Sequence, residues 1–209
     1  MEKEVKTMRM EDIVPEYRSR IWIVKNLFWK RIKESVNLAD INDNLKVLDV
    51  GCGEGFLLRE IRKRNEKCEL HGSDINLNIK KLSIDADLRI ADVRNLPYRD
   101  DYFDVVFALD VLEHINEMDL AIKEIKRVLK RDGKLIITAP TESGFYKLGR
   151  FIIKGTFSEK EGPCSTHFCN SKEVLLNIKS RGFKLVKLRN LPPIPFLTMF
   201  KLGVFENKC

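Results

Sequence analysis

A cluster of glycines next to an acidic residue is the feature of this sequence with the clearest chemical use. The run 46–50 is apolar and β-branched around Asp49, which is typical of a buried parallel strand. Gly51, Gly53 and Gly55 follow at alternate positions, and their lack of a side chain allows a tight turn and the close approach of a ligand. A helical pattern of apolar residues then begins. A strand, a glycine turn and a helix N-terminus together form a common small-molecule site in α/β folds.

A second acidic residue is expected at the same edge of the sheet. The run 68–74 is predicted to form the next strand, and it ends in Asp74, nineteen residues beyond Gly55. A βαβ unit brings the carboxyl end of that strand beside the glycine turn, where a carboxylate can accept hydrogen bonds from both hydroxyls of a ribose. The alternative is that Asp74 caps a helix that begins at Asn76.

The glycine spacing distinguishes between two kinds of nucleotide-like ligand. It is G-x-G-x-G, with Asp49 two residues before the first glycine, and not the G-x-G-x-x-G of dinucleotide-binding folds. The stretch resembles the first motif of class I methyltransferases that depend on S-adenosylmethionine (SAM), x-L-D-x-G-C-G-x-G. A pyrophosphate favours a bare helix N-terminus, whereas the ammonium and sulfonium groups of SAM suit a carboxylate. The alternative is that the glycines serve packing alone.

The resemblance implies a set of SAM contacts along the carboxyl ends of the first four strands. In the family, an acid at the position of Asp74 binds the ribose hydroxyls, and the next residue, Ile75, packs against the adenine. An acid at the position of Asp92 often binds the adenine amino group. S-adenosylhomocysteine is the implied product. The residues implied to bind SAM are Asp49, Gly51, Cys52, Gly53, Gly55, Asp74, Ile75, Asp92, Val93, Leu109 and Asp110.

The run 110–115, Asp-Val-Leu-Glu-His-Ile, carries the candidate catalytic residues. It resembles the D-V-L-E-H-[IVL] signature of the family subgroup that mostly methylates small molecules. It follows a predicted central strand at 105–109, so it lies where the acceptor and the methyl group would meet. His114 is the first candidate for a general base, because an imidazole titrates near neutral pH. Glu113 is the second candidate, as a base or as a partner that orients His114; the alternative is a purely structural pair.

The resemblance also implies the fold. We expect an α/β, Rossmann-like class I methyltransferase fold with a mostly parallel seven-stranded sheet in the order 3-2-1-4-5-7-6, flanked by helices. One domain is expected over 1–209, with an N-terminal helical segment over 1–45 and a variable cover on the acceptor side over 141–170. Amphipathic helices are predicted at 16–36 and 116–130. The other strands are predicted at 88–91, 135–139, 183–189 and 198–205.

The composition bounds the compartment and the partners. Of the 209 residues, 44% are hydrophobic and 33% charged, which describes a globular chain, and its apolar runs are too short for a membrane span. The N-terminus does not resemble a secretion signal, and five cysteines do not suggest a disulfide framework, so a cytoplasmic location is expected. A net charge of +7 favours acidic partners, which include nucleic acid, phosphorylated metabolites and anionic lipid.

The variable segment holds further candidates. His167 is a second possible base, although capping or structure is the favoured interpretation. Cys164, Cys169 and His167 lack four regularly spaced ligands, so no metal site is predicted. The apolar stretches 151–153 and 191–200 could bind a lipid-like acceptor or a second copy of the chain, although burial against the sheet is favoured. Either a monomer or a homodimer is compatible with these features.

The predicted reaction is in-line transfer of a methyl group from SAM to an O, N or C nucleophile. A small-molecule or lipid-like acceptor is ranked first, and RNA second. The run 110–113 differs from the (D/N/S)-P-P-(Y/F) motif of enzymes that methylate exocyclic base amines. A cysteine nucleophile for pyrimidine C5 does not directly follow the predicted strands at 105–109 and 135–139. A non-catalytic subunit that binds SAM is the third alternative.

Overall fold

The computed structural model describes residues 22–79, 82–141, 169–194 and 197–208. The described strands form one seven-stranded sheet with the order β3-β2-β1-β4-β5-β7-β6. The strands are β1 Lys46–Val50, β2 Glu69–Asp74, β3 Asp87–Ile90, β4 Phe103–Leu109, β5 Leu129–Pro140, β6 Phe183–Leu191 and β7 Phe200–Asn207. The first five strands are parallel, and β7 runs antiparallel between β5 and β6. The predicted fold and strand order are therefore confirmed.

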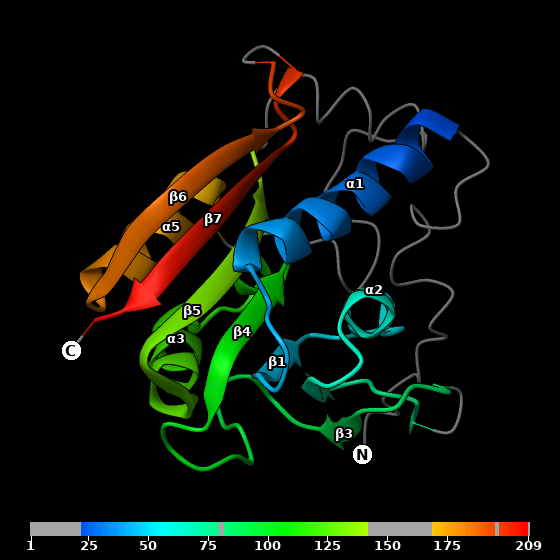
Figure 1. Ribbon diagram of the computed structural model, residues 1–209. Coiled ribbons are helices and arrows are strands. Elements are labelled where there is room, and N and C mark those ends of the chain that lie inside the picture. The colour runs from blue at the N-terminus through cyan, green and yellow to red at the C-terminus, as the bar shows by residue number, and fades with distance from the viewer. Residues whose placement is uncertain (1–21, 80–81, 142–168, 195–196, 209) are drawn as a thin grey trace, which may run out of the picture.

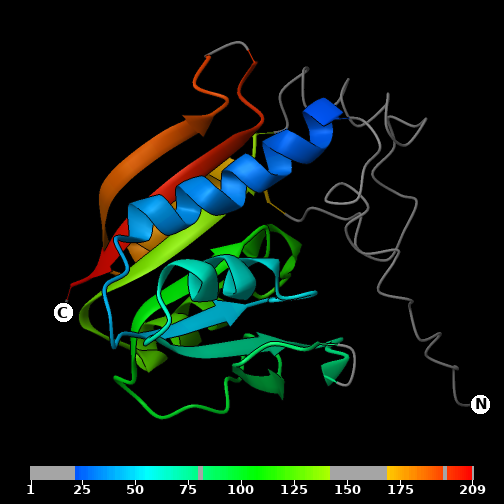
Figure 2. The same ribbon diagram turned by 45° about the vertical axis from the view of Figure 1, so that its right-hand side comes forward.

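Helices cover both faces of the sheet (Figures 1 and 2). Helices α1 (Trp22–Ala39) and α2 (Phe56–Arg64) lie on one face, and α3 (Met118–Val128) and α5 (Ser171–Ser180) on the other. Successive residues of the central strands face opposite sides: Val47 packs with the α1 and α2 side chains, whereas Leu48 packs with those of α3. This two-sided burial explains why β1 and β4 are apolar almost throughout.

The first amphipathic helix is confirmed in the part that the structure describes. Phe28, Ile32 and Val36 of the predicted apolar face are all buried against the sheet. The helix continues to Ala39, three residues beyond the predicted end at Val36. Its predicted beginning at 16–21 lies outside the described residues.

The boundary between α3 and β5 differs from the prediction. The helix ends at Val128, not at Lys130, and the strand begins at Leu129, not at Leu135. The basic residues and Gly133 in the run 130–133 are typical of a helix end and a turn. Leu129 is instead fully buried and pairs with Phe103, and pairing resumes between Lys134 and Val105, so the polar run 130–133 forms a bulge within the strand.

The segment between β2 and β3 contains no α-helix among its described residues, 75–79 and 82–86. The alternative interpretation, in which Asp74 caps a helix beginning at Asn76, is therefore wrong, because no α-helix begins there. Within the described ranges, no helix has both the length and the apolar character needed to cross a membrane.

Candidate cofactor and acceptor site

The glycine loop between β1 and α2 is folded back onto the end of β2. The backbone N–H groups of Gly51 and Cys52 donate to the carbonyl oxygen of Ser73, at 2.7 and 3.1 Å. Gly51 and Gly55 both have a φ of 69°, in the left-handed region that favours glycine. A Cβ at Gly51 would clash with Val111, and a Cβ at Gly55 would clash with Ile84. These two glycines are therefore required by the packing of the loop.

Gly53 differs from Gly51 and Gly55 because there is open space next to its Cα atom. Its φ is 48°, and a Cβ built on it would have no heavy atom of the described residues within 4 Å. Its N–H donates to Asp74 Oδ2 at 3.0 Å. Because this glycine has no side chain and no described protein atom covers it, a ligand can approach its backbone closely.

Asp74 connects the glycine loop to the end of β2. Besides the bond from Gly53, its Oδ1 accepts the backbone N–H of Asn76 at 2.8 Å, which forms a local turn. The carboxylate is half-buried, and each oxygen retains a further lone pair. Asp74 can therefore hold the loop and still accept hydrogen bonds from a pair of hydroxyls. Ile75, next to it, is 61% exposed at the same edge.

Asp49 is a buried carboxyl group within β1, with 4% of its surface exposed. Burial raises the pKa of Asp49 well above its ordinary value, because a charged carboxylate loses hydration there, and the nearby charge of Asp74 raises it further. Burial likewise raises the pKa of the Cys52 thiol, so this cysteine is not a reactive thiolate. A ligand cation beside Asp49 would favour its ionised form.

Asp92 is held by an arginine that sequence analysis did not single out. The backbone N–H of Arg94 donates to Asp92 Oδ1 at 2.9 Å, and its guanidinium reaches Oδ2 at 2.6 Å. This hydrogen bonding holds the pKa of Asp92 below its ordinary value. Arg94 also pairs with Glu117 at 2.6 Å. Val93 beside them is buried, so the loop after β3 has a fixed shape.

The turn after β4 carries the remaining predicted residues. Leu109 is half-buried, and Asp110 has a left-handed φ of 56°. Glu113 and His114 belong to a short 3₁₀ turn, η4 (Leu112–His114). Glu113 is fully buried whereas His114 is half-buried, so of these two side chains only that of His114 is partly exposed. His167 and the segment 142–168 lie outside the described residues.

Comparison with known proteins agrees with this geometry. A family model described as a methyltransferase domain matches residues 48–137, the span that contains the glycine loop and η4. These residues form a methyltransferase domain of the class I, SAM-dependent kind. A crystal structure of a SAM-dependent methyltransferase from Aquifex aeolicus matches with a TM-score of 0.63 and 18% identity, over 84% of this chain and 88% of that one.

Relatives of known name match this chain over part of their length. The ubiquinone/menaquinone biosynthesis C-methyltransferase UbiE of Laribacter hongkongensis is 35% identical over 118 residues, or 52% of this chain and 48% of that protein. The tRNA (carboxymethyluridine(34)-5-O)-methyltransferase of Arabidopsis thaliana is 34% identical over 116 residues, or 53% of this chain and 28% of that protein. The chain therefore spans about half, or less, of the length of these two relatives.

The cofactor of this family is SAM, and the residues at the sheet edge fit it. The uncovered backbone at Gly53 leaves room for a ligand, Asp74 accepts its N–H, and Asp49 lies near enough to Asp74 to be influenced by its charge. The Asp49 carboxyl group is buried, and a nearby ligand cation would stabilise its ionised form. The Asp74 carboxylate has lone pairs left to accept hydrogen bonds from hydroxyl groups.

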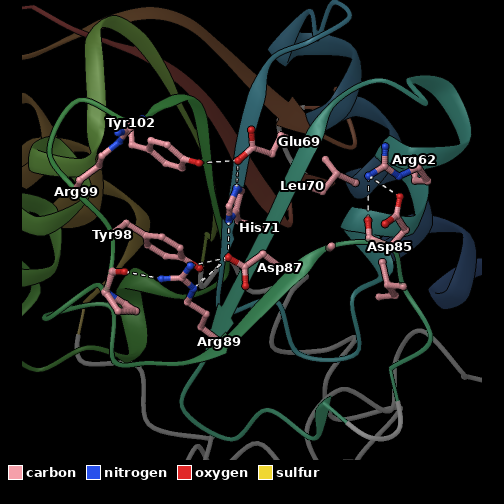
Figure 3. Close-up of a pocket in the computed structure, with 13 residues that line it drawn as sticks. Arg62, Glu69, Leu70, His71, Asp85, Asp87, Arg89, Tyr98, Arg99 and Tyr102 are labelled. Atoms are coloured by element: carbon pink, nitrogen blue, oxygen red, sulfur yellow. Dashed lines mark hydrogen bonds and ion pairs between the residues drawn. The ribbon is translucent and has the colours of Figure 1, made fainter.

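A pocket of about 750 Å³ lies elsewhere, at the amino-terminal halves of β2 and β3 (Figure 3). Its charged groups pair with one another. His71 is buried between the carboxylates of Glu69, 2.9 Å from Nε2, and Asp87, 3.3 Å from Nδ1. Arg89 binds Asp87 at 2.7 Å, and the Tyr102 hydroxyl donates to Glu69 at 2.6 Å. These contacts explain the five side chains as structural support of the sheet edge.

Replacing Tyr102 with phenylalanine is expected to make the methyltransferase more sensitive to acid. The hydrogen bond from Tyr102 is the main cause that lowers the pKa of Glu69. A carboxylate whose pKa is lower in the folded than in the unfolded protein stabilises the fold at a pH above its unfolded-state pKa. This stabilisation is lost as the pH falls through its folded-state pKa. Without the hydroxyl the pKa of Glu69 rises, so the midpoint of acid unfolding, followed by circular dichroism, moves to higher pH.

Tyr98 offers a matched control for that substitution. It lines the same pocket, and its hydroxyl is buried without a hydrogen-bond partner among the described residues. Tyr98→Phe is therefore expected to leave the free energy of unfolding unchanged or to raise it by about 1 kcal/mol. Equal acid shifts in the two variants would show that the Tyr102 hydroxyl has no special role.

Proposed function

We propose that the chain transfers a methyl group from SAM to a small-molecule or lipid-like acceptor by in-line displacement. The observation that carries the proposal is the uncovered Gly53 backbone, bound to the carboxylate of Asp74 at the carboxyl edge of a methyltransferase sheet. Asp49 would face the ammonium group of SAM, and Asp74 the ribose hydroxyls. The other predicted contacts are Gly51, Cys52, Gly55, Ile75, Asp92, Val93, Leu109 and Asp110.

SAM supplies a methyl carbon on a positively charged sulfur, which is a good leaving group. The chain's own contribution is mainly to place the acceptor atom in line with that carbon. Asp49, Asp74 and the Gly53 backbone would hold SAM, whose carbon–sulfur bond would break as the acceptor atom bonds to the methyl carbon, leaving S-adenosylhomocysteine as a neutral thioether. Where the acceptor atom carries a proton, the proposed base is His114, whose side chain is half-buried. Full burial of Glu113 favours a supporting role for its carboxylate.

The small-molecule acceptor is favoured by the D-V-L-E-H run and by likeness to UbiE, whose name states a C-methyltransferase of quinone biosynthesis. RNA is the second candidate, because the chain carries a net charge of +7 and resembles a tRNA methyltransferase at similar identity. We expect one domain and a cytoplasmic enzyme.

The acceptor class is tested by transfer of radiolabelled methyl from SAM into an extract of the source cells. The extract is separated into organic, small aqueous, RNA and protein fractions. Label in the organic or small aqueous fraction is the expected result. Nuclease-sensitive label would support RNA instead, and a SAM-binding protein that labels no fraction would support a non-catalytic subunit.

Substituting Asp74 by alanine is expected to weaken binding of S-adenosylhomocysteine about 10- to 100-fold. The variant loses two hydrogen bonds that shape the loop, from Gly53 and Asn76, as well as the proposed ribose contacts. Calorimetric titration measures the loss. Normal binding by Asp74→Ala would show that the ribose assignment is wrong.

Substituting His114 by alanine is expected to spare cofactor binding and to lower turnover about 100-fold or more, the usual contribution of a general base. The measurements are calorimetry with S-adenosylhomocysteine and the rate of label transfer. Unchanged turnover would exclude His114 as the base.

A further inference from the structure

A buried arginine of helix α1 lies under the turn that follows β4. Arg31 has only 3% of its surface exposed, which is rare for an arginine. The centre of its guanidinium lies 4.9 Å from the ring of Phe28 and 4.8 Å from the ring of Phe200. It also forms an ion pair with Asp110. One side chain thus connects α1, the start of β7 and the carboxyl end of β4.

Asp110 is the partner of Arg31 in the ion pair. Its backbone is left-handed, with a φ of 56°, and its N–H donates to the carbonyl oxygen of Thr138 at 3.2 Å. Its Oδ1 also accepts the Thr138 hydroxyl at 2.7 Å. A left-handed conformation is uncommon outside glycine and is tolerated best by Asp and Asn. The cation of Arg31 and the hydroxyl of Thr138 fix this carboxylate from two sides.

The residues that follow Asp110 reach the cofactor loop. Val111 packs directly over Gly51, in space that a Cβ on that glycine would occupy. The backbone N–H of His114 donates to the carbonyl oxygen of Val111 at 3.0 Å, which forms η4. The conformation at Asp110 therefore sets the positions of Val111 over the glycine loop and of His114 at the acceptor side.

We infer that Arg31 is a positioning residue for the methyltransferase site. Acting through Asp110, it holds the turn that covers the glycine loop and presents His114, so that helix α1 contributes to cofactor affinity without touching the cofactor. Buried ion pairs often contribute little net stability, and removal of one partner leaves the other charge uncompensated. The pair is explained by the conformation it imposes. The inference rests on the proposed placement of SAM at the glycine loop.

The test compares Arg31→Met, Asp110→Asn and the double variant by calorimetry with S-adenosylhomocysteine, well below the unfolding temperature. Arg31→Met leaves the Asp110 carboxylate without its cation, and a loss of affinity of about tenfold is expected at pH 8. The double variant keeps an acceptor for the Thr138 hydroxyl and a residue that tolerates the left-handed turn. In the Asp110→Asn background the carboxylate charge is already absent, so adding Arg31→Met is expected to lower the affinity less than about threefold relative to Asp110→Asn alone, as the coupling of contacting groups predicts.

Arg31→Lys keeps a cation and provides a milder variant, with an expected loss smaller than that of Arg31→Met. A purely structural arginine would lower the melting temperature and leave the affinity of all folded variants unchanged, which would overturn the inference. Failure here is distinguishable from failure of the proposed site. If Gly53→Ala loses binding and the Arg31 variants do not, only the role of Arg31 is wrong; if Gly53→Ala also binds normally, the cofactor lies elsewhere.

Discussion

Replacing Gly53 with alanine is expected to abolish binding of S-adenosylhomocysteine while the protein stays folded. The added methyl group would meet no described atom of the protein, so it would occupy the space that we assign to the ligand. Steric exclusion should weaken binding at least about 100-fold, equivalent to about 2.7 kcal/mol. The left-handed φ of 48° adds a separate cost to folding, about 1–2 kcal/mol for a residue with a Cβ.

Gly182 provides the control for that folding cost. It also has a left-handed φ, 86°, at the end of α5, on the opposite sheet face from α1 and α2. The atom nearest to an added Cβ is Lys126 Nζ, the flexible end of a side chain. Gly182→Ala and Gly53→Ala should lose similar stability in thermal unfolding, and only the second should lose binding in calorimetry. Normal binding by a folded Gly53→Ala would place the cofactor elsewhere.

The second large effect concerns Asp49 and pH. Because burial raises the pKa of Asp49, its carboxyl group takes up a proton at a higher pH than an exposed carboxyl group does. The ammonium of SAM or of S-adenosylhomocysteine would stabilise the ionised form, so binding at a pH near or below the raised pKa should release a proton. Affinity should therefore increase with pH and level off above the raised pKa of Asp49, as long as the ligand amine stays protonated.

Calorimetry in buffers of different ionisation enthalpy measures that proton release directly. Asp49→Asn has the same shape without the titrating group, so it should release no proton and bind about 10- to 100-fold more weakly, the loss of a charge-assisted contact. Wild-type binding without a proton released, or with the same pH profile as Asp49→Asn, would contradict the role of Asp49.

The raised pKa of Asp49 also affects the stability of the ligand-free protein. A carboxyl group whose folded pKa is raised binds more protons in the folded state than in the unfolded state. Its contribution to stability is present at low pH and is lost as the pH rises through the folded pKa. S-adenosylhomocysteine should therefore raise the melting temperature more at higher pH, and Asp49→Asn should remove this trend.

The central half of the chain could be predicted well from its sequence. The glycine spacing and the acids at 49 and 74 are local patterns, and the strand order followed from the family that they resemble. The structure places Gly53 and Asp74 in direct contact at 3.0 Å, as the βαβ geometry predicts. Parallel strands fix such contacts because their carboxyl ends share one edge.

The support of the site could not be predicted in the same way. Arg31 lies on an amphipathic helix among other basic residues, and its sequence position gives no sign that it is buried or that it pairs with Asp110, far along the chain. Periodicity shows which apolar residues share a face, but it cannot show which charged residue is enclosed. The early start of β5 at Leu129 was missed for a related reason, since it depends on pairing with Phe103.

A crystal structure of the complex with S-adenosylhomocysteine tests the central claim most directly. We predict that the ligand lies over Gly53, with its ribose hydroxyls about 3 Å from the Asp74 carboxylate, within hydrogen-bonding distance, and its ammonium group facing Asp49. The sulfur atom should point toward the turn that carries His114. A ligand bound away from the glycine loop, or one whose ribose faces away from Asp74, would contradict this account of the site.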